Sequence, residues 1–135
     1  MITFRKIEPQ DLDEIYLNEG LRSLITISSQ GERFAVVAEE DGRIKGGISG
    51  YRQDESAFIQ RIAVLPGPDK ESLEDGLVRS LAYILDREGV KRLFAGDPEN
   101  RSLLERIGFK RFDGHDSNYC MVLDLSWFFE QRSCG

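Results

Sequence analysis

Residues 58–109 read FIQRIAVLPGPDKESLEDGLVRSLAYILDREGVKRLFAGDPENRSLLERIGF, and the order of elements in this stretch decides the fold. A strand comes first and stops at a proline-rich break. Residues 69–88 then carry leucine and isoleucine side chains at helical spacing, and Gly89 ends the helix. A short strand at residues 91–95 and a helix that ends near Gly108 follow. This order predicts a β-α-β crossover, which joins two parallel strands of one sheet.

Antiparallel elements surround this crossover. Residues 34–38 and 43–52 are expected to form a hairpin across the turn dipeptide Asp41-Gly42. The other strands are expected at residues 2–7, 56–64, 109–112 and 119–125, and the other helices at residues 9–16, 21–27 and 97–106. The predicted fold is therefore α/β (α+β), with a mixed, mostly antiparallel central sheet of about six to seven strands and about four flanking helices. Residues 1–135 are expected to form one domain, with a C-terminal tail at 126–135.

The composition excludes several classes of partner. Among 135 residues, 18 are basic and 24 are acidic, which gives a net charge of -6 with no cluster of Lys or Arg. An acidic chain of this kind is a poor binder of nucleic acid or anionic membranes. No apolar run reaches the length of a membrane span and the N-terminus is not a signal peptide, so a cytoplasmic protein is expected. Cys120, Cys134 and the single His115 form no metal or disulfide pattern.

Several motifs, in this order, resemble those of the GNAT superfamily of acetyl-CoA-dependent N-acetyltransferases over nearly the whole chain. They are Phe4-Arg5-Lys6, Asp41-Gly42, Arg61-Ile62-Ala63-Val64-Leu65-Pro66, Gly89-Val90 and Ile107-Gly108-Phe109. The resemblance implies that acetyl-CoA is the co-substrate and that its pantetheine arm pairs with the main chain of Ile62, Ala63 and Val64 like an added strand. The diphosphate is expected on backbone amides at the start of the next helix. The residues implied there are Ser72, Leu73, Glu74, Asp75, Gly76, Leu77 and Val78, and Asn100 resembles a family asparagine that hydrogen-bonds the cofactor arm.

The entrance of this helix departs from the family pattern. Of the family's glycine-rich loop, only Gly76 matches. Four carboxylates crowd the entrance, and like charge repels a phosphate. Ser72 with Asp75 resembles a capping box, which would use the helix amides itself. We therefore expect a divergent family member with a degraded cofactor-phosphate loop. The four carboxylates are those of Asp69, Glu71, Glu74 and Asp75.

Residues for acid–base chemistry are sparse. Direct acetyl transfer needs a base for the ammonium proton and an acid for the leaving thiolate. Gln60 stands near a position where family members often carry a glutamate, and Leu104 stands where they often carry a tyrosine. No catalytic residue is assigned, and the candidates are Tyr119 on the closing strand and Glu39 near the hairpin turn. The alternatives are a core or interface tyrosine, a solvated glutamate and, for Asn100, a helix cap.

Three functions remain open from the sequence. The first is an N-acetyltransferase that acts on an unidentified small-molecule or protein amine by direct attack. The second is a catalytically inactive GNAT-fold module that binds acyl-CoA or regulates. The third is an interaction domain that uses Trp127, Phe128 and Phe129, a cluster that an aromatic plug on the fold or a homodimer contact would explain. Acceptor-binding residues are expected in residues 17–30 and 113–118.

Overall fold

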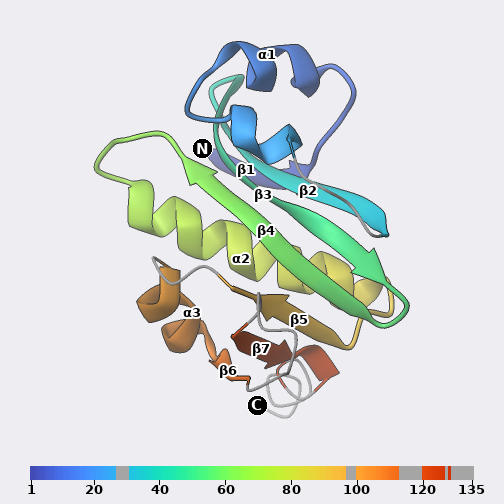
Figure 1. Ribbon diagram of the computed structural model, residues 1–135. Helices are drawn as coiled ribbons and strands as arrows, with labels where there is room; N and C mark the ends of the chain where they lie inside the picture. Colours follow the sequence, from blue (N-terminus) through green and yellow to red (C-terminus); the bar gives the residue numbers. More distant parts are fainter. Residues whose placement is uncertain (27–30, 97–99, 113–119, 127, 129–135) are drawn as a thin grey trace.

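The computed structural model describes residues 1–26, 31–96, 100–112, 120–126 and 128, and its strands form one mixed sheet in the order β1-β2-β3-β4-β5-β7-β6 (Figure 1). The strands are β1 (Ile2–Lys6), β2 (Glu32–Glu40), β3 (Arg43–Gln53), β4 (Ser56–Val64), β5 (Arg92–Ala95), β6 (Lys110–Arg111) and β7 (Met121–Asp124). The helices are α1 (Asp11–Leu17), α2 (Lys70–Arg87) and α3 (Arg101–Ile107), with a short 3₁₀ helix, η1 (Arg22–Ile25). The predicted fold class is confirmed: a mixed, mostly antiparallel seven-stranded sheet with flanking helices.

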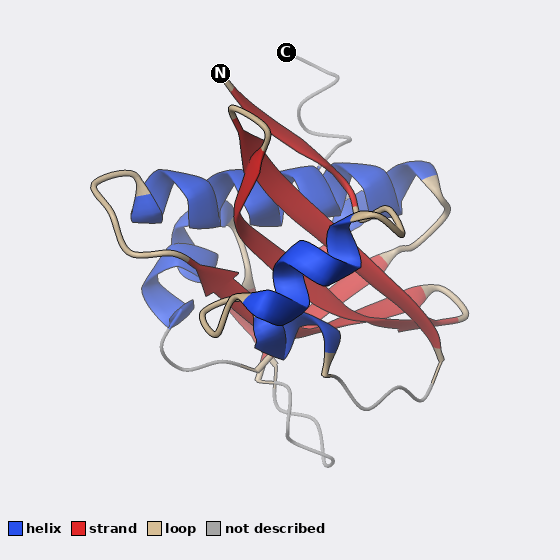
Figure 2. Cartoon of the chain, turned by 90° about the horizontal axis from the view of Figure 1, so that it is seen from above, coloured by secondary structure: helices blue, strands red, loops and turns tan. Residues whose placement is uncertain are grey.

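The two faces of the sheet carry different helices, with α2 on one side and α1 and η1 on the other (Figure 2). Alternation along β2 explains this arrangement because successive side chains of a strand point to opposite faces. Val36 belongs to the larger core under α2, and Val37 belongs to a smaller core under α1 and η1. Fully burying one leucine stabilises a fold by about 1.5–3 kcal/mol, so the leucines of α2 fix this helix on the sheet. They are Leu73, Leu77, Leu81 and Leu85, each at most 6% exposed.

The strands β4 and β5 pair over a short length only. Residues 56–59 lie opposite residues 92–95 in parallel register, as the predicted crossover requires. Residues 60–64 of β4 have β3 on one side and, within the described chain, no strand on the other. An irregularity after Ser49 leaves Gln60 as an extra residue in β4, which is a β-bulge. Residues 60–64 are called the free edge of β4 below.

Some local predictions differ from the structure. Residues 22–25 form the 3₁₀ helix η1 in place of the α-helix expected at residues 21–27. The prediction of a capping box at Ser72 and Asp75 is wrong, because α2 begins at Lys70 and Ser72 is already inside its first turn. Asp69 occupies the capping position, and its side chain makes no capping hydrogen bond. The closing strands are shorter than expected, and β7 inserts between β5 and β6 because it pairs with both.

The C-terminal aromatic cluster is described only at Phe128, which packs against the larger core. Trp127 and Phe129 lie outside the described residues, as do Tyr119 and the loop at 113–118. None of the helices in the described part of the chain combines the length and apolar character needed to cross a lipid bilayer.

Gly76 makes room for the ring of Phe4. A Cβ atom on Gly76 would lie 2.2 Å from Cζ of Phe4, far inside any real contact distance. Since Phe4 belongs to β1, the missing side chain lets this edge strand pack beneath α2. Packing therefore accounts for the one family-like glycine of the helix entrance.

Gly76→Ala is expected to lower the free energy of unfolding by about 1 kcal/mol. Alanine favours a helix by about 1 kcal/mol over glycine, but overpacking against Phe4 costs about 1–3 kcal/mol. Urea denaturation of both proteins measures the difference. The matched comparison repeats the substitution in a Phe4→Leu background, where alanine has space and should be neutral or stabilising. An equal loss in both backgrounds would contradict the contact.

Candidate functional site

A cavity of about 400 Å³ lies between the free edge of β4, the start of α2 and the region of α3. It is called the β4 cavity below. Its walls bring together segments that are far apart in the sequence. Five of the residues implied by the family resemblance line it: Ile62, Ala63, Val64, Glu74 and Asn100.

The free edge of β4 supplies main-chain hydrogen-bonding groups to this cavity. Ile62 and Ala63 lie opposite Ile48 and Gly47 of β3, so the groups on that side of the strand are used by the sheet. The N–H and C=O groups of an edge strand on its other side have no strand partner. An extended ligand that carries amide groups can add to such an edge.

Four of the seven residues expected at the helix entrance face inward. Leu73, Leu77 and Val78 are buried in the larger core, and Gly76 lies against Phe4. Their side chains are therefore occupied by packing. Ser72 is exposed, Glu74 lines the β4 cavity, and Asp75 is half-buried beside Arg79.

Of the residues expected to offer backbone amides at the start of α2, only Ser72 has an open one within the described chain, together with the preceding Glu71. The N–H of Leu73 donates to the carbonyl oxygen of Asp69 over 2.9 Å, and that of Lys70 donates to Gly67 over 3.3 Å. Between them, the N–H groups of Glu71 and Ser72 have no acceptor in the described part of the chain. Unbonded N–H groups and the helix dipole favour an anion at such a position.

Arginine side chains neutralise two of the four carboxylates at this entrance. Nη2 of Arg106 lies 2.8 Å from Oε1 of Glu71, and Nε of Arg79 lies 2.9 Å from Oδ2 of Asp75. Arg106 and Lys70 both line the β4 cavity. Sequence reasoning missed Arg106, because Arg106 and Glu71 are 35 positions apart and no local pattern joins them.

Asn100 stands at the N-cap position of α3, but its side chain makes no capping hydrogen bond. The helix-cap alternative is therefore not supported by the geometry. Asn100 also lines the β4 cavity, so its amide is placed where it can hydrogen-bond a ligand.

Two buried polar atoms lie where β4 leaves β5. Ser49 is 1% exposed, and neither its Oγ nor Oε1 of Gln60 has a hydrogen-bond partner among the described residues. Gln60 directly follows the last residue of β4 that pairs with β5, and it immediately precedes Arg61, the register partner of Ser49. A buried polar group without a partner costs about 1–3 kcal/mol, so these two enclosed atoms lower the stability of the fold.

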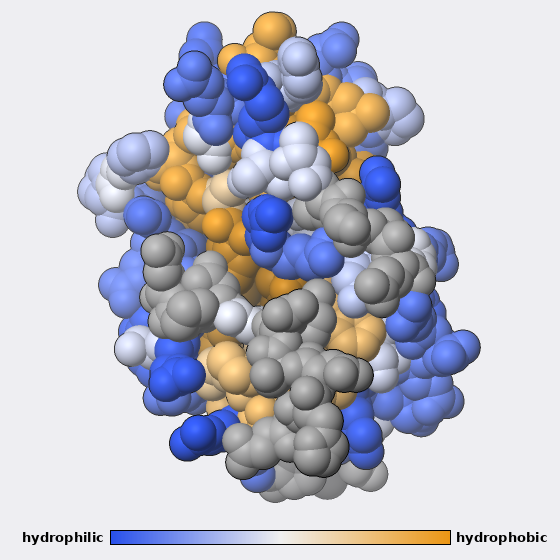
Figure 3. Space-filling model, in the orientation of Figure 1, coloured by the Kyte–Doolittle hydropathy of each residue, from blue (hydrophilic) through white to orange (hydrophobic). Residues whose placement is uncertain are grey.

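An aromatic row crosses the sheet beside this vertex. The ring centroids of Tyr51 and Phe58 are 5.0 Å apart, those of Phe58 and Phe94 are 5.1 Å apart, and Phe112 meets Phe94 edge-on at 5.1 Å. Phe58 alternates with Ala57 and Ile59 of the larger core, so it points to the face opposite α2. On that face, apolar side chains run across the middle over β4, with charged side chains around them (Figure 3). Sequence analysis missed the row because strand register brings its members together.

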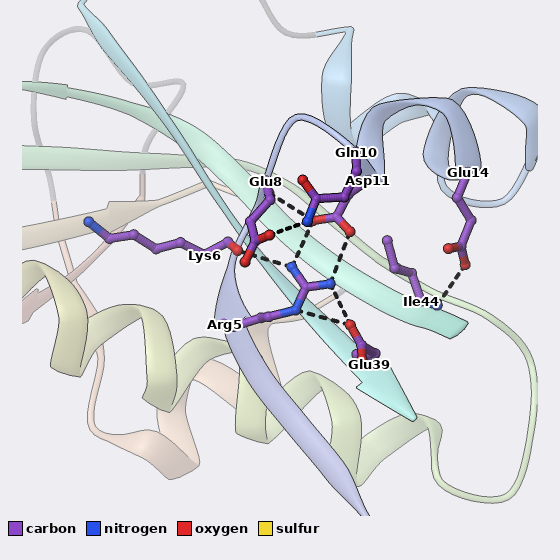
Figure 4. A network of polar contacts seen from close by, with 8 residues as sticks. All are labelled: Arg5, Lys6, Glu8, Gln10, Asp11, Glu14, Glu39 and Ile44. Atoms are coloured by element: carbon purple, nitrogen blue, oxygen red, sulfur yellow. Dashed lines mark hydrogen bonds and ion pairs between the residues drawn. The ribbon is translucent and has the colours of Figure 1, made fainter. Parts of the chain in front are cut away.

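Glu39, one of the two catalytic candidates, is held in an ion-pair network (Figure 4). Arg5 of β1 lies between Glu39 of β2 and Asp11 of α1, with 3.0 Å from its Nε to Oε2 of Glu39 and 2.7 Å from its Nη1 to Oδ2 of Asp11. Asp11 is 5% exposed and also accepts the N–H of Glu8 over 2.7 Å. Glu39 is not among the residues that line the β4 cavity. Glu39 thus belongs to an ion-pair network that links β1, β2 and α1. Tyr119, the other candidate, lies outside the described residues.

The sequence of the chain matches one known protein family. Residues 2–109 match the model described as the acetyltransferase (GNAT) family. This match covers most of the chain. No curated protein matches the sequence closely enough to count as a relative.

Solved structures share the fold. The ribosomal-protein-S18-alanine N-acetyltransferase from Escherichia coli superposes with a TM-score of 0.72 at 18% identity, over 93% of this chain and 94% of that one. The PaiA N-acetyltransferase from Thermoplasma acidophilum, in complex with coenzyme A, gives 0.71 at 16% identity, over 92% and 99%. A GNAT family acetyltransferase from Brucella melitensis, in complex with acetyl-CoA, gives 0.67 at 22% identity, over 92% and 88%. At these identities the likeness shows the fold alone.

Asp11→Asn is expected to lower the free energy of unfolding by about 2 kcal/mol at neutral pH, because it removes the charge from a buried pair. The hydrogen bonds from Arg5 hold the pKa of Asp11 below its ordinary value. The stabilisation is therefore fully present above that ordinary value, about 3.9, and is lost as the pH falls through the lower folded-state pKa. Denaturation from pH 7 down to about pH 2 should show the two proteins converging. The exposed Asp13→Asn serves as the control, and a difference between Asp11→Asn and wild type that did not shrink in acid would exclude this origin.

Ser49→Ala is expected to raise the free energy of unfolding of the ligand-free protein by about 1 kcal/mol, because it removes a buried hydroxyl that has no partner. Calorimetric melting measures the change. Ser56→Ala, at a half-buried position of β4, is the matched control and should be neutral or slightly destabilising. A loss of stability in Ser49→Ala would mean that the hydroxyl makes a structural hydrogen bond.

Proposed function

This chain belongs to the GNAT family of acetyltransferases, and we propose that it is an active N-acetyltransferase that moves an acetyl group from acetyl-CoA to a small-molecule or protein amine. The observation that carries the proposal is the β4 cavity, where the free edge of β4, the start of α2 and Asn100 face one space. Because a fold by itself does not assign an activity, the proposal rests on this arrangement of groups.

Acetyl-CoA would bind with its pantetheine arm along the free edge of β4. The amides of the arm pair with the main chain of residues 62–64, and the side chain of Asn100 adds a hydrogen bond. The diphosphate would lie toward the open amides of Ser72, which the family resemblance implied, and of the preceding Glu71. Two of the structural neighbours hold coenzyme A or acetyl-CoA, which supports this choice of ligand.

The thioester would then lie at the vertex where β4 leaves β5. The lone pair of the acceptor amine attacks the carbonyl carbon, the C–S bond breaks, and the leaving thiolate takes up the proton that the amine loses, directly or through water. Gln60 cannot take up that proton at neutral pH because its side chain is an amide, so the site would act by orienting the two bound partners. Orientation of this kind supplies a large part of the rate in reactions between two bound partners. The aromatic row beside the vertex offers an apolar surface for the rest of the acceptor.

An inactive acyl-CoA-binding module is the second candidate. The observation that favours it is Gln60, an amide in the region where family members often carry a carboxylate base. Such a module would bind acetyl-CoA in the same cavity and leave the acetyl group in place.

Titration with acetyl-CoA separates these candidates from a protein that has lost the ligand. At about 100 times the dissociation constant, a ligand of the folded state stabilises it by about 2.7 kcal/mol, which a melting curve detects. Release of free thiol with a panel of primary amines then reports turnover. Binding with turnover supports the enzyme and binding without turnover on any amine supports the module. The absence of a melting shift at millimolar acetyl-CoA would contradict both.

Asn100→Ala is the site-specific arm of this test. We expect it to weaken acetyl-CoA binding about 10-fold, the loss of roughly one good hydrogen bond, while the melting temperature without ligand stays unchanged. A lower melting temperature without ligand would mean that the side chain of Asn100 stabilises α3 as a helix cap.

A further inference from the structure

The ion pair between Glu71 and Arg106 lies on the wall of the β4 cavity, and it joins the first turn of α2 to the last turn of α3. We propose that Arg106 is the phosphate-binding cation of this protein and that Glu71 is its internal counter-ion, which the phosphate of the bound cofactor replaces. This inference rests on the proposed function, since it concerns how the same cavity takes up acetyl-CoA.

The exposure of the pair makes the exchange easy. The side chain of Arg106 is 60% exposed and that of Glu71 is 75% exposed. Ion pairs between exposed side chains contribute little to stability, so neither helix depends on this one. The diphosphate of acetyl-CoA can replace the carboxylate because a guanidinium binds phosphate in the same two-pronged geometry. The diphosphate also carries two negative charges where the carboxylate carries one.

The surroundings of the pair add groups that can bind a phosphate, alongside one further carboxylate, that of Glu74. Lys70 lines the same cavity and adds a second cation. The N–H groups of Glu71 and Ser72, which have no acceptor within the described ranges, add donors at the same turn. Two cations and two open donors thus meet beside the cavity, and in the ligand-free protein the Glu71 carboxylate engages one of those cations.

The second ion pair of this helix offers a matched comparison. Arg79 and Asp75 form the same kind of contact, at 2.9 Å against 2.8 Å, but within one helix and four positions apart. Neither residue is among those that line the β4 cavity. Substitutions in this pair change the net charge of the protein by the same amount without touching the proposed phosphate site.

The test is calorimetric titration of wild type, Glu71→Gln and Arg106→Gln with two ligands, acetyl-CoA and S-acetyl-pantetheine, which lacks all phosphates. For acetyl-CoA we expect Arg106→Gln to weaken binding about 10-fold, the worth of one charge-assisted hydrogen bond. Glu71→Gln should tighten it about 3-fold, because the competing carboxylate is gone. Neither substitution should change the affinity for S-acetyl-pantetheine. Both variants should have the same melting temperature as wild type when no ligand is present.

The controls are Arg79→Gln and Asp75→Asn, which should leave the affinity for acetyl-CoA within about 2-fold of wild type, since exposed charges at a distance are screened. Equal affinity of wild type and Arg106→Gln for acetyl-CoA would overturn the inference, and so would weaker binding by Glu71→Gln. A loss by Arg106→Gln that is the same for both ligands would also overturn it, because it would show a structural effect. If wild type bound neither ligand, the proposed function itself would fail, which is a distinguishable result.

Discussion

The parallel pairing of β4 with β5 over residues 56–59 is the contact on which the rest of the site depends. It is long enough to hold β5 in the sheet, where β7 pairs with its other side. It is also short enough that residues 60–64 of β4 keep their outer main-chain groups for a ligand. The bulge at Gln60 marks the point of divergence and leaves polar atoms there without partners. A regular continuation of the pairing would consume the edge that forms the cavity.

The helix entrance shows how charge in a sequence differs from charge in a fold. Counted along the chain, the four carboxylates near the start of α2 predict a negative charge that repels a phosphate. In the structure, Arg106 forms an ion pair with Glu71, and Arg79 forms one with Asp75. Gly76 packs against Phe4, so the presence of this glycine is explained without a phosphate. The charge at the cavity therefore depends in part on Arg106, which lies 35 positions from its partner Glu71. Counting charges along one helix includes Arg79 but omits Arg106, because Arg106 belongs to another helix.

The order of elements and the mixed sheet could be predicted because they follow from short-range periodicity. Leucines at helical spacing predict α2 whatever lies around it, and the Asp41-Gly42 turn specifies the hairpin of β2 and β3. Three features of the site could not be predicted in this way. The aromatic row depends on strand register, the pair of Glu71 and Arg106 joins separate helices, and the exact start of α2 depends on how the chain leaves β4. Residues 62–64 were named from the family resemblance and not from periodicity, and their part in cofactor binding stays a prediction.

The position of β7 has a consequence for how the molecule is made. The strands β1 to β4 lie in the sheet in the order of synthesis, after which β5 joins through its crossover helix. The strand β7, the last of the described strands, lies between β5 and β6 and pairs with both. Neither β5 nor β6 can complete its hydrogen bonds until residues 121–124 have left the ribosome. Until then the nascent chain exposes two open strand edges, which are surfaces prone to mispairing. The half of the sheet next to α3, a helix that supplies residues to the wall of the β4 cavity, is thus completed after the half that contains β1 to β4.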